Sequence, residues 1–261
     1  MTLEQLIFAD PAEKPLDTIV SDGGYCGIFR TIGCVGDSLS SGEFEGTGED
    51  GKSTYHDMYD YSWGQYLARM AGCTARNFSR GGMTGKEYCE SFAEARGFWD
   101  PAKACQAYII ALGVNDLYGL KQPVGEMSDV NTEDADTFTG WYARIIRRLK
   151  GIQPKAKFFF VTIPRETNMN EEMAALADAH AARLHELAAY FKNVYVMDFR
   201  AYAPVHDEAF THMFYLHGHM NPMGYRLFAE QVCSYMDYII RHNPREFVNV
   251  PFIGNETPML C

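Results

Sequence analysis

The chain has few basic residues: 23 Lys and Arg stand against 34 Asp and Glu, a formal net charge of −11 in 261 residues. Nucleic acids and anionic membrane surfaces are bound by basic faces, so we expect neither as a partner. No run of residues approaches the roughly 20 apolar positions that a membrane-spanning helix needs. Met1–Asp10 also lacks the basic and then apolar pattern of a secretory signal. These absences predict a cytoplasmic protein without a membrane span.

Paired cysteine motifs are absent as well. The seven cysteines are an odd number and contain no CxxC pair, which indicates reduced thiols and disfavours structural zinc. The sequence also has no internal repeat, low-complexity tract or obvious linker. We therefore expect one domain over residues 1–261, with a core at about 31–240 and an extension at each end. We expect no cofactor and no metal, and the sequence does not indicate an oligomeric state.

Apolar runs alternate with amphipathic segments along the chain, which predicts an α/β fold whose parallel sheet is covered on both faces. Five runs read as strands: Thr31–Val35, Thr74–Phe78, Ala107–Leu112, Lys157–Ile163 and Asn193–Asp198. Helices are predicted at Tyr61–Ala71, around Phe138–Lys150, at Asn170–Phe191, and from Pro222 to about Ile240 with Asn221 as cap. Two acidic, glycine-rich segments follow strands, Ser41–Asp60 and Leu117–Asp136, and are expected to be loops beside the ligand crevice.

Four short motifs lie at the ends of these predicted elements, and each is weak alone because Gly, Asp, Asn and Ser are ordinary turn residues. The first is Gly36-Asp37-Ser38, which stops an apolar run abruptly. In chain order the others are Asn77–Thr84 with its Gly81-Gly82 pair, Gly113-Val114-Asn115-Asp116, and His219–Tyr225. A nucleophile, a proton acceptor and hydrogen-bond donors are what acyl transfer requires.

In this order the four motifs resemble the SGNH, or GDSL, hydrolase superfamily, and the resemblance covers roughly Thr31 to Ile240. It implies a flavodoxin-like three-layer α/β/α sandwich with a mainly parallel five-stranded sheet. It also implies an ester hydrolase that works through a serine acyl-enzyme on a small-molecule ester. We expect a short, acetyl-type acyl group, on a carbohydrate for example, because no long apolar lid is visible.

By this resemblance Ser38 is the nucleophile and His219 the general base. The oxyanion donors are the Ser38 amide, the Gly82 amide and the Asn115 side chain. The residue types suit these roles: an imidazole is available as a base near pH 7, glycine lets its backbone approach a reacting oxygen, and Asn donates without a charge. Asp37 is read as a structural turn residue.

The sequence departs from the family before the histidine. Members commonly carry an Asp three residues upstream to orient the imidazole, and this chain has Leu216 there. Any acceptor can fix the tautomer. A Ser–His dyad oriented by a backbone carbonyl is therefore one option, and a distant acid such as Asp207 or Glu208 is the other.

Three other functions compete with this one. Gly46–Ser53 matches the phosphate-loop pattern GxxxxGK[ST], but that loop must start after a buried strand and open into a helix. A metal site could draw on the histidines and acids of the same region, His206, Asp207, Glu208, His212, His217 and His219. A non-catalytic carbohydrate-binding protein of this fold would need no reactive serine.

Overall fold

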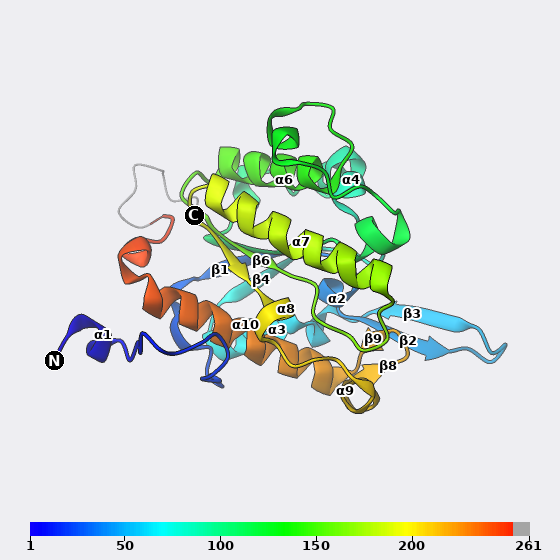
Figure 1. Cartoon of the computed structure of the whole chain (residues 1–261), viewed down its shortest axis with the longest axis horizontal. Coiled ribbons are helices and arrows are strands. Elements are labelled where there is room, and N and C mark those ends of the chain that lie inside the picture. The colour runs from blue at the N-terminus through cyan, green and yellow to red at the C-terminus, as the bar shows by residue number, and fades with distance from the viewer. Residues whose placement is uncertain (253–261) are drawn as a thin grey trace.

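Five parallel strands form the central sheet of the computed structural model, which describes residues 1–252 (Figure 1). They are β1 (Thr31–Gly36), β4 (Thr74–Ser79), β5 (Ala107–Ala111), β6 (Lys157–Val161) and β7 (Val194–Met197). All five predicted strands are thus confirmed. Their order is β4-β1-β5-β6-β7, and every neighbouring pair is parallel. Renumbered within the sheet this is 2-1-3-4-5, the order of flavodoxin-like folds.

Helices connect and cover these strands. In chain order, the α-helices are α1 (Leu3–Leu6), α2 (Ser38–Ser41), α3 (Trp63–Ala71), α4 (Gly85–Glu87), α5 (Ala93–Ala95), α6 (Phe138–Ile152), α7 (Glu171–Tyr190), α8 (Phe199–Tyr202), α9 (Glu208–Phe214) and α10 (Pro222–His242). Short 3₁₀ or π turns lie at Gly24–Ile28, Tyr59–Tyr61, Tyr88–Phe92, Pro101–Lys103, Asn115–Gly119, Met127–Asn131 and Pro244–Phe247. No helix of residues 1–252 is long and apolar enough to cross a membrane.

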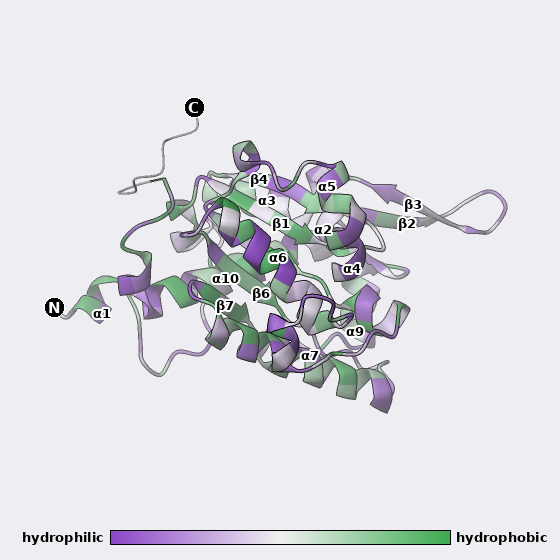
Figure 2. Ribbon diagram, turned by 90° about the horizontal axis from the view of Figure 1, so that it is seen from above, coloured by the Kyte–Doolittle hydropathy of each residue, from purple (hydrophilic) through white to green (hydrophobic). Residues whose placement is uncertain are grey.

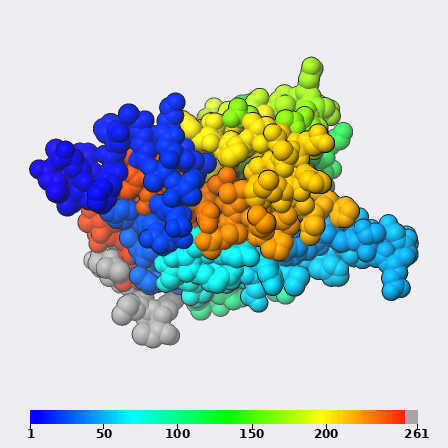
Figure 3. Space-filling model, turned by 90° about the horizontal axis from the view of Figure 1, so that it is seen from below, coloured from blue at the N-terminus to red at the C-terminus, as the bar shows by residue number. Residues whose placement is uncertain are grey.

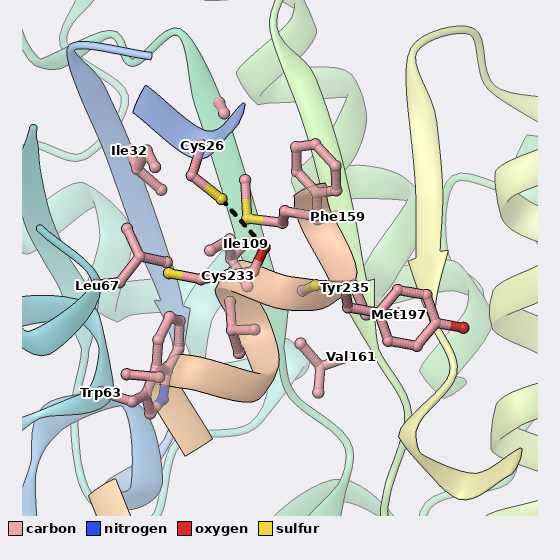
Figure 4. Close-up of a cluster of buried hydrophobic side chains, with 14 of the residues drawn as sticks. Cys26, Ile32, Trp63, Leu67, Ile109, Phe159, Val161, Met197, Cys233 and Tyr235 are labelled. Atoms are coloured by element: carbon pink, nitrogen blue, oxygen red, sulfur yellow. Dashed lines mark hydrogen bonds between the residues drawn. The ribbon is translucent and has the colours of Figure 1, made fainter. Parts of the chain in front are cut away.

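Two apolar clusters cover the two faces of the sheet, which confirms the three-layer α/β/α architecture. One cluster joins the sheet to α3 and α10 and includes Trp63, Phe159 and Cys233 (Figure 4). The other joins it to α6 and α7 through side chains such as Tyr142 and Leu184. Hydrophilic and hydrophobic residues both occur along α6 and α7, as expected of helices with one buried face (Figure 2).

The segment Ser41–Asp60 is not the loop that the sequence predicts. It forms an antiparallel hairpin of β2 (Glu43–Thr47) and β3 (Ser53–Asp57), which projects from the body of the protein (Figures 1 and 3). The phosphate-loop pattern, Gly46–Ser53, spans the last two residues of β2, the turn at the tip and the first residue of β3. Since β2 lies outside the parallel sheet and a strand rather than a helix follows Lys52, the context that phosphate binding requires is missing.

The N-terminal residues lie against α10 (Figure 3) and are anchored there by buried charges. The Arg241 guanidinium is 2.7 and 2.8 Å from the two carboxylate oxygens of Glu13, and its Nε is 2.7 Å from Asp237. Charged side chains are rarely buried unless they are paired in this way. The predicted C-terminal extension, Asn243–Cys261, lies partly outside the described residues.

Candidate active site

Ser38 lies at the carboxyl edge of the sheet, where β1 ends and α2 begins. The strand order reverses at β1, whose neighbours are β4 and β5. Ligands of open α/β sheets bind at such a switch point, outside the carboxyl ends of the strands. The fold therefore presents Ser38 at the position where a ligand is expected.

The turn that presents Ser38 depends on its two preceding residues. Asp37 caps α2, and its carboxylate accepts a hydrogen bond from the Leu39 amide at 3.1 Å. A Cβ on Gly36 would come within 3 Å of the Ser40 side chain, so only glycine lets the chain turn this tightly. Asp37 is 4 % exposed, and this burial raises the pKa of its carboxyl from 3.8 to about 7. The structural role predicted for Asp37 fits this geometry.

Asn115 connects two of the other motifs. It follows β5, and its side-chain amide donates to the Asp37 carboxylate and to the Met83 carbonyl, both at 3.3 Å. Asp37 is the residue before Ser38, and Met83 is the residue after Gly82. The side-chain amide of Asn115 therefore lies between the Ser38 turn and the Gly82 turn.

Gly82 has a φ of +70°, a conformation that side chains other than glycine rarely adopt. Nothing lies within 4 Å of where its Cβ would be. The backbone of Gly82 therefore borders open space, which leaves room for a substrate.

His219 forms the two-residue strand β9 (His219–Met220), which pairs with β8 (Tyr215–Leu216). Both β9 and β2 pack against α2. His219 is two residues before the α10 cap, Asn221, whose side chain accepts from the Gly224 amide at 2.9 Å. The structure thus brings the histidine to the same sheet edge as Ser38, Gly82 and Asn115.

Two glutamates that the sequence analysis missed flank this histidine. Nδ1 of His219 is 3.2 Å from Oε2 of Glu45, and Nε2 is 3.2 Å from Oε1 of Glu43. Asp207, one of the predicted acids, instead caps α9 by accepting from the Phe210 amide at 2.8 Å. Glu208 is exposed in the first turn of α9. The alternation of Glu43-Phe44-Glu45 and the glycines that follow are a hairpin signal, but nothing in it indicates a contact 174 residues away.

A small pocket of about 70 Å³ opens beside these residues. Its wall contains residues adjacent in sequence to three of the predicted site residues: Asp37 and Leu39 around Ser38, Val114 before Asn115, and Met220 after His219. Its other lining side chains are mainly apolar and include Trp63 and Phe228, from α3 and α10. Trp63 lies near the end of β1 in Figure 4. The indole N–H of Trp63 and the hydroxyl of Ser40 are buried without a partner among the described residues.

The histidines proposed as alternative metal ligands do not form a metal site. His206 stacks on Phe210 at 4.1 Å between ring centroids, and its Nδ1 is 3.3 Å from the Tyr215 hydroxyl. Within residues 1–252, no group of three or more His, Cys, Asp or Glu side chains is arranged to hold a metal ion.

Comparison with known proteins identifies the family. The family model described as "GDSL-like Lipase/Acylhydrolase family" matches residues 34–227, a range that includes all four motifs. The chain belongs to this family. Membership supports an esterase or acylhydrolase that acts on small molecules. No curated protein sequence matches the chain significantly.

Solved structures share the fold of this GDSL-family chain at low sequence identity. One is a family two carbohydrate esterase from Clostridium thermocellum, in complex with cellohexaose. It is 17% identical with a TM-score of 0.57, over 91% of this chain and 67% of that one. Another is Est24, a carbohydrate acetylesterase from Sinorhizobium meliloti, 13% identical with a TM-score of 0.56, over 80% of this chain and 99% of that one. At such identities the likeness shows the fold alone.

Proposed function

We propose that the chain hydrolyses carboxylic esters through an acyl-enzyme on Ser38. The Ser38 hydroxyl oxygen attacks the ester carbonyl carbon while His219 takes the hydroxyl proton. The bond to the alcohol then breaks, and His219 returns the proton to the departing oxygen. Water repeats the sequence on the acyl-enzyme, releasing the acid and restoring Ser38. The observation that carries this proposal is the Asn115 amide, held between the Ser38 and Gly82 turns.

The oxyanion that forms in each step needs donors that are already in place. The amides of Ser38 and Gly82 and the side chain of Asn115 are the proposed donors. Asn115 is supported in this role because its NH₂ group lies between the two turns and donates without a charge. Both of its hydrogen bonds are long, at 3.3 Å, and one of the two N–H groups turns from its present acceptor to the oxyanion. Preorganised donors of this kind usually supply the largest part of the stabilisation of the transition state.

The pocket supports a short acyl group. A volume of about 70 Å³ accommodates on the order of five groups the size of a water or a methylene. Because Trp63 and Phe228 are among its walls, an acetyl group or a slightly longer chain fits and the chain of a membrane lipid does not.

A carbohydrate is the proposed alcohol half of the ester. Two structural neighbours are described as carbohydrate esterases, one of them as an acetylesterase. Tyr55 offers an exposed aromatic ring on the hairpin, 57% accessible and 5.8 Å from the His219 ring between centroids. An aromatic surface at this place can pack against the apolar face of a sugar ring.

A cytoplasmic location stays a prediction from the sequence, in line with the free thiols of the six cysteines among residues 1–252.

The test compares the wild type with Ser38→Ala on p-nitrophenyl acetate. We expect hydrolysis by the wild type, loss of hydrolysis in Ser38→Ala, and covalent labelling of Ser38 by a fluorophosphonate. Hydrolysis that survives in Ser38→Ala would contradict the proposal. A wild type that is neither active nor labelled would also contradict it and would favour the non-catalytic carbohydrate-binding alternative.

A further inference from the structure

The position that usually carries the acid of the family is apolar in this chain. Leu216 stands three residues before His219 and is 44% exposed, and its side chain has no group that accepts a proton or a hydrogen bond. The carboxylates that do reach His219 come from β2, and that of Glu45 belongs to a residue 174 positions earlier in the chain. The orientation of the imidazole therefore has to be explained by the hairpin.

The hairpin presents two carboxylates to the histidine because successive side chains of a strand point to opposite faces. Glu43 and Glu45 are two residues apart on β2 and so share a face. Their side chains are only 14% and 12% exposed, and that of His219 is 15% exposed. Tyr55 pairs with Glu45 in the hairpin and places its ring edge-to-face against the histidine. The imidazole is thus enclosed by one supersecondary element.

The two glutamates differ in the nitrogen that they contact. In a serine–histidine–acid arrangement the acid accepts from Nδ1, and Nε2 takes the proton of the nucleophile. Glu45 faces Nδ1, and its oxygen Oε2 also accepts from the Gly218 amide at 2.9 Å. Its other oxygen accepts from the Ser53 hydroxyl at 2.9 Å. Glu45 is therefore held on three sides in the place of the acid.

Glu43 is on the opposite side of the ring, at the nitrogen that would serve Ser38. Its carboxylate also lies against Gly81, where an added Cβ would collide with Oε2. Burial raises the pKa of Glu43, whereas the hydrogen bond from the Gly218 amide lowers the pKa of Glu45. Glu45 is thus the better ionised of the two and the one with fixed geometry.

We propose that Glu45 is the positioning residue of His219, supplying from β2 the carboxylate that other members of the family place three residues before the histidine. The inference rests on the proposed function, since positioning matters for catalysis only if His219 is the base. With Glu45 at Nδ1, the proton is kept on that nitrogen, and Nε2, which lies 3.2 Å from Oε1 of Glu43, is left with the lone pair that a base needs. The proposal is a triad of Ser38, His219 and Glu45. It takes the place of two hypotheses from the sequence: a Ser–His dyad oriented by a backbone carbonyl, and a triad completed by Asp207 or Glu208.

The kinetic test uses Glu45→Gln, which keeps the size and an acceptor for the Gly218 amide but removes the charge. We expect kcat for p-nitrophenyl acetate to fall about 10²- to 10³-fold, with KM changed less than about twofold. The loss is smaller than the ~10⁴-fold loss for a fully buried triad acid because the Glu45 side chain keeps some contact with water. Glu49→Gln is the matched control: it makes the same change at the exposed tip of the same hairpin, away from His219, and should leave kcat within about twofold. Glu45→Asp should retain more activity than Glu45→Gln.

A spectroscopic test separates this inference from the proposed function. A proton shared between Nδ1 and a carboxylate gives a strongly deshielded resonance in the proton spectrum of protein labelled with ¹⁵N-histidine. We expect this resonance in the wild type and in Ser38→Ala, and its loss in Glu45→Gln. An ester-inactive wild type that shows this pattern would overturn the proposed function and leave the positioning intact. Persistence of the resonance in Glu45→Gln, or an unchanged kcat in an active enzyme, would overturn the role of Glu45.

Discussion

Replacing Asp37 by Asn should stabilise the protein more as the pH rises. The Asp37 carboxyl is 4 % exposed and is shielded from water below the Ser38 turn. Burial raises its pKa from 3.8 to about 7, and the negative charges of Asp116 and Glu43 act in the same direction. The folded protein therefore resists the ionisation of this group, whereas the unfolded chain ionises it near its ordinary pKa.

The size and the sign of the effect follow from these two pKa values. A shift of about three units corresponds to about 4 kcal/mol between folded and unfolded states. Because the folded pKa is the higher one, the unfolded state holds fewer protons between pH 4 and pH 7, and stability falls as the pH rises through that window. The cost is absent below about pH 4 and complete above about pH 7. The neutral amide of the Asp37→Asn variant would carry no such cost at any pH.

The assay is denaturant unfolding of the wild type and Asp37→Asn from pH 4 to pH 8. The hydrogen bonds of Asp37 with Leu39 and Asn115 are partly changed by the amide, which adds an offset that does not depend on pH. Asp116, whose pKa burial raises to about 6, is present in both proteins, but its contribution cancels only in part because its charge acts on Asp37. The difference in the free energy of unfolding, variant minus wild type, should therefore increase by up to about 4 kcal/mol between pH 4 and pH 7. A difference that is flat across this range would refute the reasoning.

Three further outcomes are expected. Asn115→Ala should lower kcat for ester hydrolysis about 10²- to 10³-fold, because one oxyanion donor is lost; steady-state kinetics on folded protein checks this, and an unchanged rate would remove Asn115 from the site. Trp63→Phe should raise the ratio of kcat/KM for butyrate over acetate esters about tenfold, the value of one methylene in an apolar pocket; an unchanged ratio would mean that this pocket does not hold the acyl group. Arg241→Leu should cost about 3–5 kcal/mol of unfolding free energy, because the buried carboxylates of Glu13 and Asp237 both lose the guanidinium that neutralises them; thermal unfolding and limited proteolysis of the N-terminal residues measure it.

The sheet could be predicted because each of its strands is a local signal. Lys157–Val161 is a run that is buried at every position, and a strand covered on both faces needs such a run. The predicted ends differ from the observed ones by one residue at the end of Ala107–Ala111 and at both ends of Val194–Met197, and by two residues at the end of Lys157–Val161. The start of α10 was likewise visible in the sequence, since Asn221 and Pro222 are favoured at the cap and first position of a helix.

The hairpin could not be predicted with the same ease. Its strands are short and rich in charged residues, with β2 half-buried and β3 mostly exposed, and the alternation Glu43-Phe44-Glu45 is too short to mark a strand by itself. The Gly46–Ser53 pattern is typical of a phosphate-binding loop instead. The missed acid, Glu45, meets His219 only through the tertiary fold, and its local sequence carries no sign of a partner so distant along the chain.

One physical reason explains why the sequence motifs could be predicted and the contact between Glu45 and His219 could not. A nucleophile and its oxyanion donors must converge on one carbonyl oxygen within hydrogen-bond distance, and in this fold the ends of β1, β4 and β5 provide such a point. The proposed nucleophile and donors, Ser38, Gly82 and Asn115, are therefore tied to fixed places in the sequence. The acid has a looser requirement, since any carboxylate that reaches Nδ1 of His219 fixes the imidazole. A hairpin inserted between β1 and α3 meets this requirement as well as a residue upstream of the histidine does. A leucine at position 216 is therefore compatible with the proposed catalysis, because the carboxylate of Glu45 lies 3.2 Å from His219.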